Sequence, residues 1–366
     1  MEGVLYSFGR AEDGGYNPSS DLISVKDILY GTAGGDGNGN GIVYSITTSG
    51  KKTTVYSFKG YPADGAGPND LISVNGTLYG TTVGGGTQRY GTVFAITPSG
   101  KETVLHSFAG GLGDGSGPSG RLISVNGTLY GTTFLGGANG KHGTVFAITP
   151  SGKENVVYSF AGGQGDGADP SAGLLNVNGT LYGTTENGGL NCTNSGYDYG
   201  CGTVFKLTPS QGHYTERVLH RFKGDPSDGQ NPLADLINVN GTLYGTTDSG
   251  GKKGGGTVFA ITTSGTETVL HKFAGGPGDG SDPSAGLVNI NGTLYGTTWQ
   301  GGANRIGTVY SVRTSGTETV VYSFQGSPGD GANPAARLIN VNGALYSTTV
   351  YGGEKHNAGT VFELTP

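Results

Sequence analysis

The sequence is poor in several features that define common classes of protein. Only 13% of its 366 residues are charged and 33% are hydrophobic, with one Trp, one Met and two Cys. No segment approaches the ~18 consecutive apolar residues of a membrane-spanning helix, and residues 1–8 lack the basic and apolar regions of a signal peptide. The net charge of −6, without a basic cluster, argues against nucleic acid as the main partner. We therefore expect neither a spanning helix nor a signal peptide in this chain.

Glycine is the residue that the sequence has in abundance. It contains 75 Gly and 15 Pro, and because Gly costs about 1 kcal/mol per helical position relative to Ala, long helices are nearly excluded. The same composition without a period would indicate a low-complexity chain. Here the Gly and Pro residues recur periodically, which favours a folded, turn-rich, all-β protein over disorder.

An internal repeat of about fifty residues organises the whole chain. Its most regular part is Leu-Tyr-Gly-Thr (Leu-Tyr-Ser-Thr in the last copy), whose Tyr occurs at Tyr30, Tyr79, Tyr130, Tyr182, Tyr244, Tyr295 and Tyr346. Each copy has four short segments rich in β-branched and aromatic residues, as strands are. In the second copy they are Leu71–Val74, Thr77–Thr82, Gly91–Thr97 and Thr103–Phe108. Asn-Gly joins the first two segments in six copies, and this dipeptide favours the type I′ turn of a β-hairpin.

Four antiparallel strands repeated seven times predict one all-β domain over residues 1–366, a seven-bladed β-propeller. A solenoid would need distinct capping repeats, and none is visible. Val4–Phe8 matches a fourth strand and Thr360–Thr365 matches a third strand. The N-terminal strand is therefore expected to complete the last blade and close the ring. Blade four carries an insertion near residues 190–201.

The repeated blocks Asp-Gly-x-x-Pro, Asn-Gly-x-Leu-Tyr-Gly-Thr-Thr, Gly-Gly and Gly-Thr-Val-Phe resemble the GloVer (Gloeobacter/Verrucomicrobia-type) tandem repeat. The resemblance covers all seven copies, with mild departures in the first, where Lys26-Asp27 replaces Asn-Gly and Ala33 replaces Thr. It implies a propeller in a secreted or surface-anchored bacterial protein. It transfers no activity and no catalytic residues.

The face that carries the fourth-to-first and second-to-third connections, here called the long-loop face, is where a site is expected, because loops on a rigid scaffold carry binding residues. Its second-to-third loops begin with Glu186, Asp248 and Trp299 in blades four, five and six, and Asp235 lies nearby in the sequence pattern. Two carboxylates beside an aromatic platform have the composition of a sugar site, in which one acid could protonate a leaving oxygen while another acts as base or nucleophile. A solvated acidic rim with an ordinary surface Trp explains the same residues, and we favour it over catalysis.

Residues that precede the first strands are expected to lie near the central channel. In blade order they are Asp21, Asp70, Arg121, Gly173, Asp235, Gly286 and Arg337. Adjacency around the ring predicts two salt bridges, Arg337 with Asp21 and Asp70 with Arg121. It leaves Asp235 without a partner, and it predicts open space at Gly173 and Gly286.

An Asp precedes Gly in each fourth-to-first loop: Asp13, Asp64, Asp114, Asp166, Asp228, Asp279 and Asp330. One carboxylate per loop is too few for a calcium cage, so an Asx-turn within the loop is favoured. Where a second carboxylate follows, as in the pairs Asp166 with Asp169 and Asp279 with Asp282, calcium is the one cofactor considered. The repeated Tyr is expected to pack between blades.

The two cysteines, Cys192 and Cys201, bracket the insertion in blade four. A disulfide is expected, since two thiols without an adjacent His make a poor metal site and disulfides suit secreted proteins. The bridge would stiffen a loop whose Tyr197 and Tyr199 are candidate ligand contacts. His106, His220 and His271 share one fourth-strand position and are interpreted as outer-strand surface residues.

Three hypotheses on function follow. The first is a secreted or cell-surface binding module with a glycan or an extracellular protein on the long-loop face. The second is a glycan-active hydrolase or lyase that uses Glu186, Asp248 and Asp235, with Trp299 as platform. The third is a structural building block of a surface or fibre. Repetition, few ionisable groups and the lack of a catalytic constellation favour binding or structure over enzymology.

Overall fold

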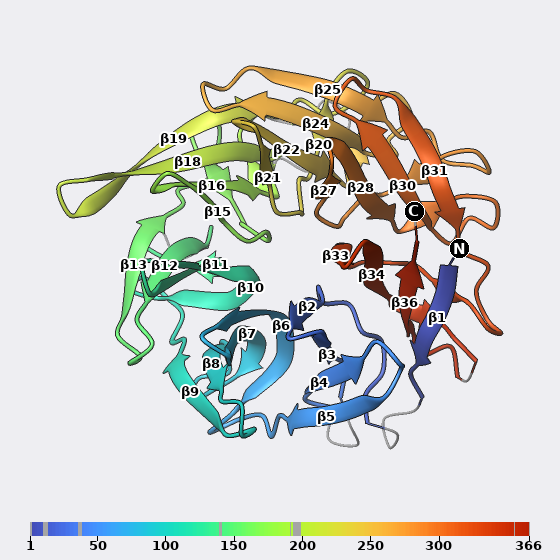
Figure 1. Ribbon diagram of the computed structural model, residues 1–366. Coiled ribbons are helices and arrows are strands. Elements are labelled where there is room, and N and C mark those ends of the chain that lie inside the picture. The colour runs from blue at the N-terminus through green and yellow to red at the C-terminus, as the bar shows by residue number, and fades with distance from the viewer. Residues whose placement is uncertain are drawn as a thin grey trace.

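The computed structural model describes residues 2–9, 14–35, 39–138, 141–190, 192, 199–354 and 356–365. These residues form seven four-stranded antiparallel sheets around a central axis (Figure 1), and none of them lies in a helix. The predicted seven-bladed β-propeller is therefore confirmed. It follows that no described segment could cross a membrane as an apolar helix.

The strands of the first three blades run from the channel outward in chain order. Blade one has β2 (Ile23–Val25), β3 (Ile28–Ala33), β4 (Ile42–Thr47) and β5 (Lys52–Ser57). Blade two has β6 (Gly65–Val74), β7 (Thr77–Gly85), β8 (Thr92–Ile96) and β9 (Glu102–Ser107). Blade three has β10 (Gly115–Val125), β11 (Thr128–Gly136), β12 (Thr144–Ile148) and β13 (Glu154–Ser159).

The next three blades follow the same order. Blade four has β15 (Leu175–Val177), β16 (Thr180–Thr185), β18 (Thr203–Ser210) and β19 (His213–Arg221). Blade five has β21 (Ile237–Val239), β22 (Thr242–Thr247), β24 (Thr257–Thr262) and β25 (Glu267–Lys272). Blade six has β27 (Val288–Ile290), β28 (Thr293–Thr298), β30 (Thr308–Arg313) and β31 (Glu318–Ser323).

Blade seven closes the ring as the sequence predicted. It consists of β33 (Ile339–Val341), β34 (Ala344–Thr349), β36 (Thr360–Leu364) and β1 (Glu2–Ser7), and Figure 1 shows both chain ends at this blade. β1 pairs antiparallel with β36, with Glu2 opposite Leu364 and Ser7 opposite Thr360. The first segment of the chain thus supplies the outer edge of the last blade.

Short two-stranded sheets build the long-loop face of blades four to seven. They pair β14 (Gly167–Ala168) with β17 (Asn187–Gly188), β20 (Gly229–Gln230) with β23 (Ser249–Gly250), β26 (Gly280–Ser281) with β29 (Gln300–Gly301), and β32 (Gly331–Ala332) with β35 (Tyr351–Gly352). In blades two and three the longer strands β6, β7, β10 and β11 include the same pairing. These ribbons fix the backbone of the loops that carry the candidate site.

The hydrophobic core lies between the blades. Each interface contains an edge-to-face aromatic triplet, such as His106–Phe108–Phe146, in which two rings from one outer strand meet a third-strand ring of the next blade at centroid distances of 4.8 and 5.2 Å. Buried Leu and Val side chains surround the triplet, and the repeated Tyr, for example Tyr79, packs against it as expected. The blades therefore depend on their neighbours for burial.

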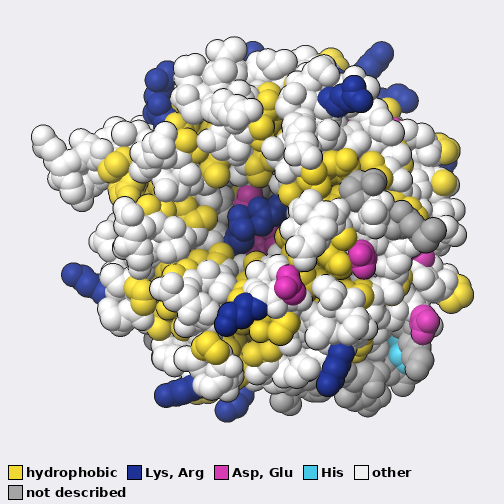
Figure 2. Space-filling view, in the orientation of Figure 1, with side chains coloured by type: hydrophobic (Ala, Val, Ile, Leu, Met, Phe, Trp, Pro, Cys, Tyr) yellow, Lys and Arg dark blue, Asp and Glu magenta, His cyan; other side chains and the backbone are white. Residues whose placement is uncertain are grey.

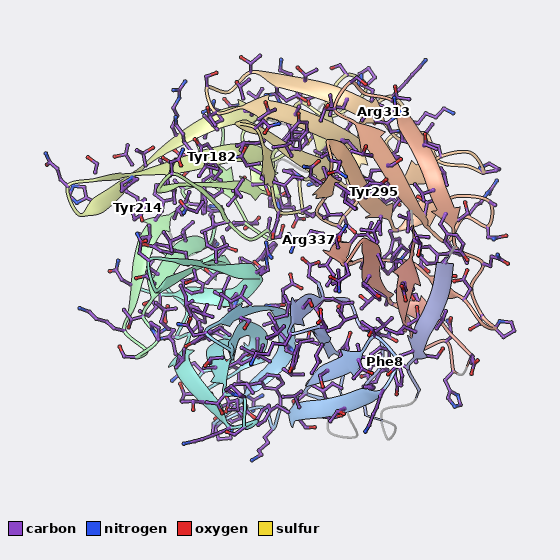
Figure 3. All side chains as sticks on the ribbon, in the orientation of Figure 1. Phe8, Tyr182, Tyr214, Tyr295, Arg313 and Arg337 are labelled. Atoms are coloured by element: carbon purple, nitrogen blue, oxygen red, sulfur yellow. A yellow bond between two sulfur atoms is a disulfide. The ribbon has the colours of Figure 1, made fainter. Side chains whose placement is uncertain are left out.

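Blade four departs from the others in two ways. Its outer hairpin β18–β19 is longer than its counterparts and projects from the ring in Figure 1. On this hairpin the Tyr214 hydroxyl donates to the Tyr130 hydroxyl in blade three at 3.1 Å, and Figure 3 labels Tyr214 there. Cys192 and Cys201 form the expected disulfide. Tyr199 is 68% exposed, whereas Tyr197 lies outside the described residues.

Candidate functional site

One repeated backbone contact positions the first residue of each second-to-third loop. The N–H groups of Glu186, Asp248 and Trp299 donate to the carbonyls of Asp169, Asn231 and Asp282 at 3.0–3.1 Å. Each acceptor precedes a Pro and has a positive φ of 54–60°, which Asn and Asp tolerate better than most residues. The three side chains therefore stand at equivalent, rigidly held places on neighbouring blades.

Glu186 and Asp248 lie in a row of carboxylates on the long-loop face. Burial raises the pKa of Glu186 above its ordinary value, and the nearby charges of Asp169 and Asp248 raise it further. Burial likewise raises the pKa of Asp248, and Asp282 adds to the effect. The row thus runs Asp169, Glu186, Asp248, Asp282 over three blades, and we name it the acidic row.

Trp299 follows the acidic row on blade six. It contacts Tyr351 of blade seven edge-to-face, with ring centroids 6.2 Å apart, and the Asn333 side chain donates to the Trp299 carbonyl at 3.0 Å. An open pocket of about 380 Å³ adjoins Tyr351 of this pair and is also lined by Asn333, Ile306 and neighbouring residues. Sequence analysis missed Tyr351, although an aromatic residue one place after Val350 breaks the repeat and could have signalled it.

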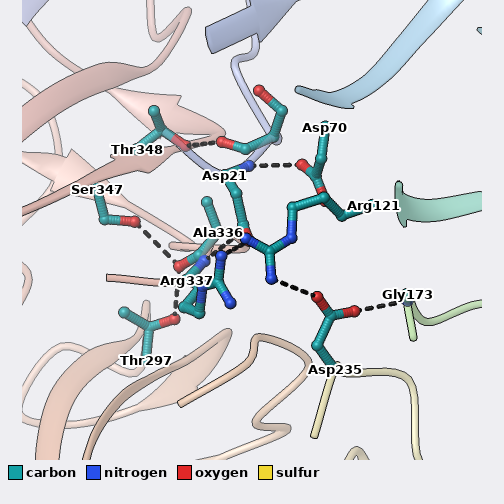
Figure 4. A network of polar contacts seen from close by, with 11 residues as sticks. Asp21, Asp70, Arg121, Gly173, Asp235, Thr297, Ala336, Arg337, Ser347 and Thr348 are labelled. Atoms are coloured by element: carbon teal, nitrogen blue, oxygen red, sulfur yellow. Dashed lines mark hydrogen bonds and ion pairs between the residues drawn. The ribbon is translucent and has the colours of Figure 1, made fainter. Parts of the chain in front are cut away.

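Asp235 lies in the central channel, where its contacts differ from the prediction. Arg121 pairs with Asp235 at 3.4 Å rather than with Asp70, while Arg337 pairs with Asp21 at 3.1 Å as expected (Figure 4). Figure 2 shows cationic and anionic side chains in the hollow at the centre of the ring, and Figure 3 labels Arg337 there. Asp235 is therefore part of the channel network, and the acidic row does not include it.

The channel carboxylates also hold the blades together through backbone groups. Asp21 accepts the Arg337 N–H, Asp70 accepts the Asp21 N–H, and Asp235 accepts the Gly173 N–H, at 2.6–2.7 Å. Burial raises the pKa of Asp70 to about 7, with Asp21 and Asp235 adding to the shift. Each acceptor comes from the blade after the donor's blade, so these contacts tie neighbouring blades at the channel.

The open space expected at two glycines of the channel is not there. A Cβ on Gly173 would lie 2.9 Å from an Asp235 carboxylate oxygen, and one on Gly286 would lie 3.2 Å from Cδ of Arg337. The side chains of neighbouring blades fill these places. What remains is a polar cavity of about 200 Å³ lined by the three aspartates and by backbone and Ser groups.

The repeated Asp side chains of the described loops bond the backbone of their own loop, as the sequence favoured, but they accept the N–H groups of the next residue and of the fifth residue before, which is not an Asx-turn. Asp166 accepts the N–H groups of Ala161 and Gly167 and the Tyr158 hydroxyl at 2.6–2.9 Å. Asp169, the second carboxylate of this candidate calcium pair, accepts the Asn187 side-chain amide at 2.9 Å.

In the second predicted calcium pair the two carboxylates also have different partners. Asp279 accepts the N–H groups of Ala274 and Gly280, and Asp282 accepts the Ser281 hydroxyl. Asp13 lies outside the described residues.

The histidines at the outer strands are not the surface residues that the sequence suggested. His106, His220 and His271 are 17–22% exposed, and each pairs with the Asp of the following loop at 3.1–3.2 Å. A Glu from the next blade completes each group. The signal in the sequence was the shared spacing of eight residues between His and Asp.

The fold and the repeat together define a seven-bladed propeller built from one tandem unit. The model of the Gloeobacter/Verrucomicrobia repeat matches residues 2–193 and 190–366. The chain therefore belongs to this repeat family. Among curated proteins, none matches the chain in sequence.

Several solved structures share the fold at low sequence identity. A puromycin hydrolase matches with a TM-score of 0.59 and 12% identity over 99% of this chain and 55% of its own. The extracellular domain of a putative hybrid two-component system from B. thetaiotaomicron matches with a TM-score of 0.60 and 9% identity. The match covers 99% of this chain and 39% of that protein. PorZ, a surface component of the type-IX secretion system of Porphyromonas gingivalis, matches with a TM-score of 0.56 and 12% identity. The match covers 98% of this chain and 47% of PorZ. This chain thus spans about half or less of these proteins, and the likeness concerns the fold alone.

Proposed function

We propose that this chain is an extracellular binding module that recognises a glycan on the long-loop face of blades four to seven. The observation that carries the proposal is the continuity of the acidic row with the Trp299–Tyr351 pair. The Asp282 carbonyl accepts the Trp299 N–H. This hydrogen bond holds the loop with the last carboxylate of the acidic row against the loop that begins with Trp299. Carboxylates accept hydrogen bonds from sugar hydroxyls, and aromatic faces offer the apolar surface against which a pyranose ring stacks.

Rigidity supports binding. The positions are fixed by two-stranded ribbons and by interblade bonds such as Asn231 to the Glu186 carbonyl at 3.2 Å. A preorganised site loses less conformational entropy when a ligand binds. The disulfide favours an oxidising, extracellular setting, in keeping with the extracellular and surface proteins among the structural neighbours.

The first experiment is a glycan-array screen of the purified protein, with and without calcium, followed by calorimetry on the best ligand. Trp299→Ala should weaken binding about tenfold or more, which corresponds to ~1.4 kcal/mol. Phe134→Ala is the matched control, because Phe134 begins the equivalent loop of blade three and should leave affinity unchanged. If no glycan on the array binds, or if Trp299→Ala and Phe134→Ala lose the same amount of affinity, the proposal is overturned.

The hydrolase or lyase alternative makes a separate prediction for the same ligand. Glu186→Gln removes the charge and keeps the shape, so a binding module retains affinity within a few-fold and turns over nothing. An enzyme that uses Glu186 as acid or base would bind and lose turnover in this variant. Product analysis of the bound glycan by mass spectrometry separates the two.

A further inference from the structure

Three interblade contacts at the outer rim bring one histidine and two carboxylates together. In the first, His106 Nε2 lies 3.2 Å from Asp114 Oδ2, and Glu154 completes the group. In each group one ligand atom of every residue lies within 4.8 Å of the others. The three groups are His106–Asp114–Glu154, His220–Asp228–Glu267 and His271–Asp279–Glu318. We name them the rim triads.

The fold builds each rim triad from two blades. His106 lies on β9 of blade two, Asp114 lies in the loop to blade three, and Glu154 begins β13 of blade three. Backbone N–H groups of Ala109 and Gly115 hold the Asp114 carboxylate at 2.7 Å. Phe108 holds the imidazole edge-to-face at 4.8 Å. The His106 imidazole and the Asp114 carboxylate are therefore held in place by the protein itself, before any bound ion.

The glutamates supply an independent observation. Oε1 of Glu154, Glu267 and Glu318 each has under 1 Å² of accessible surface and no hydrogen-bond partner, and the same holds for Oε1 of Glu2, Glu102 and Glu216 at the interfaces without His. A buried carboxylate oxygen without a donor carries an uncompensated desolvation cost. In the same triads the second carboxylate, from Asp, adds further negative charge. A bound cation would compensate both.

The interface between blades seven and one shows how the chain places a cation at this rim. Lys52 occupies the register position that Glu102 occupies on the next outer strand, opposite Ile46 and Ile96 respectively. Its ammonium group donates to the Gly14 carbonyl and lies 5.7 Å from the Phe8 ring centroid. Where the glutamate is absent, a built-in positive charge takes its place.

We propose that each rim triad binds one divalent transition-metal ion of the zinc type, which ties two neighbouring outer strands together. One imidazole nitrogen and two carboxylate oxygens suit zinc, whereas calcium prefers oxygen ligands alone. Bonds of about 2.0–2.2 Å place tetrahedral ligands about 3.3–3.6 Å apart, slightly more than the 3.1–3.2 Å between His and Asp atoms. The Glu oxygen closes the set, and water fills the fourth position.

The chain contains its own controls at three other interfaces. There Tyr replaces His beside the same pair of carboxylates, in the groups Tyr56–Asp64–Glu102, Tyr158–Asp166–Glu216 and Tyr322–Asp330–Glu2. The Tyr hydroxyl donates to the Asp at 2.8–2.9 Å. These groups lack the nitrogen ligand, so they should bind zinc far more weakly.

The test is metal stoichiometry on the full, tag-free chain after dialysis against chelator. Calorimetry with Zn²⁺ should give three sites per chain, and Co²⁺ should give visible d–d bands. His106→Tyr, which installs the residue found at the equivalent Tyr56, should give two sites. Tyr158→His should create a fourth. His213→Gln, on the exposed β18–β19 hairpin, should leave three.

Several outcomes would overturn the proposal. One is the absence of any site that binds Zn²⁺ with a Kd below about 10 μM. Another is a number of zinc sites that His106→Tyr does not change. A third is six zinc sites per chain, which would include the three Tyr groups. Circular dichroism of each variant verifies the fold. Glu154→Gln offers a second route, since it should weaken one site at least tenfold without altering packing. None of these readouts depends on the acidic row or on Trp299, so a failure of the zinc proposal is distinguishable from a failure of the glycan proposal.

Discussion

Glutamates at the interblade rim illustrate how burial sets the chemistry of a single residue. Burial raises the pKa of Glu102 to about 7, the charge of Asp64 adds to the shift, and Tyr56 and Lys59 act in the opposite direction. The folded chain therefore holds the Glu102 proton more tightly than the unfolded chain does. The resulting stability is complete below about pH 4.5 and is lost as pH rises through about 7.

Glu102→Gln should remove this dependence at one interface. We expect the variant to raise Tm by roughly 1–2 °C at pH 8 and to leave it unchanged at pH 4. Thermal melts followed by circular dichroism measure both values. Glu354→Gln, at an exposed position, is the control and should change neither. An equal shift at both pH values would show that the charge is not the cause.

Gly173 offers a second test at the residue scale. A Cβ there would meet the Arg121 carbonyl at 2.7 Å and the Asp235 carboxylate at 2.9 Å. Gly173→Ala should therefore destabilise the protein by about 1–3 kcal/mol through overpacking. Urea unfolding measures the change. Gly278→Ala is the control, because a Cβ at Gly278 meets no atom within 4 Å.

The channel pairs show which contacts adjacency in a repeat predicts. Arg337 and Asp21 were predicted because they stand on adjacent blades, and the structure has this pair. Arg121 instead reaches past blade four to Asp235. It can do so because Gly173, between them, has no side chain to block the way. The order of the blades alone could not show whether Arg121 would pair with Asp70 on the adjacent blade or with the more distant Asp235.

At the scale of the strand, the sequence predicted the hairpins well. It did not predict which side chains of the outer strands face the next blade. Asn-Gly turns and short segments rich in β-branched and aromatic residues marked the strands directly. Each outer strand, however, carries a β-bulge: the partner of Val93 is His106, whereas that of Phe94 is Val104, so Leu105 is skipped. The bulge changes which side chains face the next blade. The position of His106 on an outer strand, which Tyr occupies in other copies, therefore did not reveal that its side chain faces the next blade.

The outer strand also carries the ring that anchors each interface. Phe8, on the segment after β1, is 1% exposed and contacts Tyr6 and Tyr44 edge-to-face. Phe8→Ala should cost about 3–5 kcal/mol, because the cavity opens between the last and first blades. Chemical denaturation measures the loss. Val83→Ala, at a 53% exposed position, should stay within about 0.5 kcal/mol of the parent.

For the whole molecule, the regular repeat made the architecture predictable, while the site depends on its departures from regularity. The acidic row became visible only when β14–β17 and its counterparts placed Asp169 and Asp282 beside Glu186 and Asp248. The sequence offered those two aspartates only as second carboxylates of candidate calcium pairs, because each lies three residues after a repeated Asp. Spacing along a loop does not show which residues of another loop lie beside a side chain.

Ring closure makes a prediction for the whole molecule. A circular permutant that joins residues 365 and 2 by a short turn and opens the chain beside Leu112, which is 73% exposed, should fold and melt within a few degrees of the parent. Removal of residues 1–8 should instead expose the edge of β36 and cause aggregation. Size-exclusion chromatography and thermal melts distinguish the two results. Folding of the truncated chain to a monomer would contradict the role of β1.

The pairing of β1 with β36 also has a consequence for the order of events during biosynthesis. Glu2 is synthesised before any of the blades, and its partner Leu364 lies 362 residues later in the chain. At about 5–20 residues per second, the first strand waits on the order of tens of seconds for its partner. Throughout that interval both edges of β1 are open to incorrect pairing. The ring can therefore close only after β36 has been synthesised, so early blades must stay soluble while incomplete, and a chain exported before closure must assemble its last blade outside the cell.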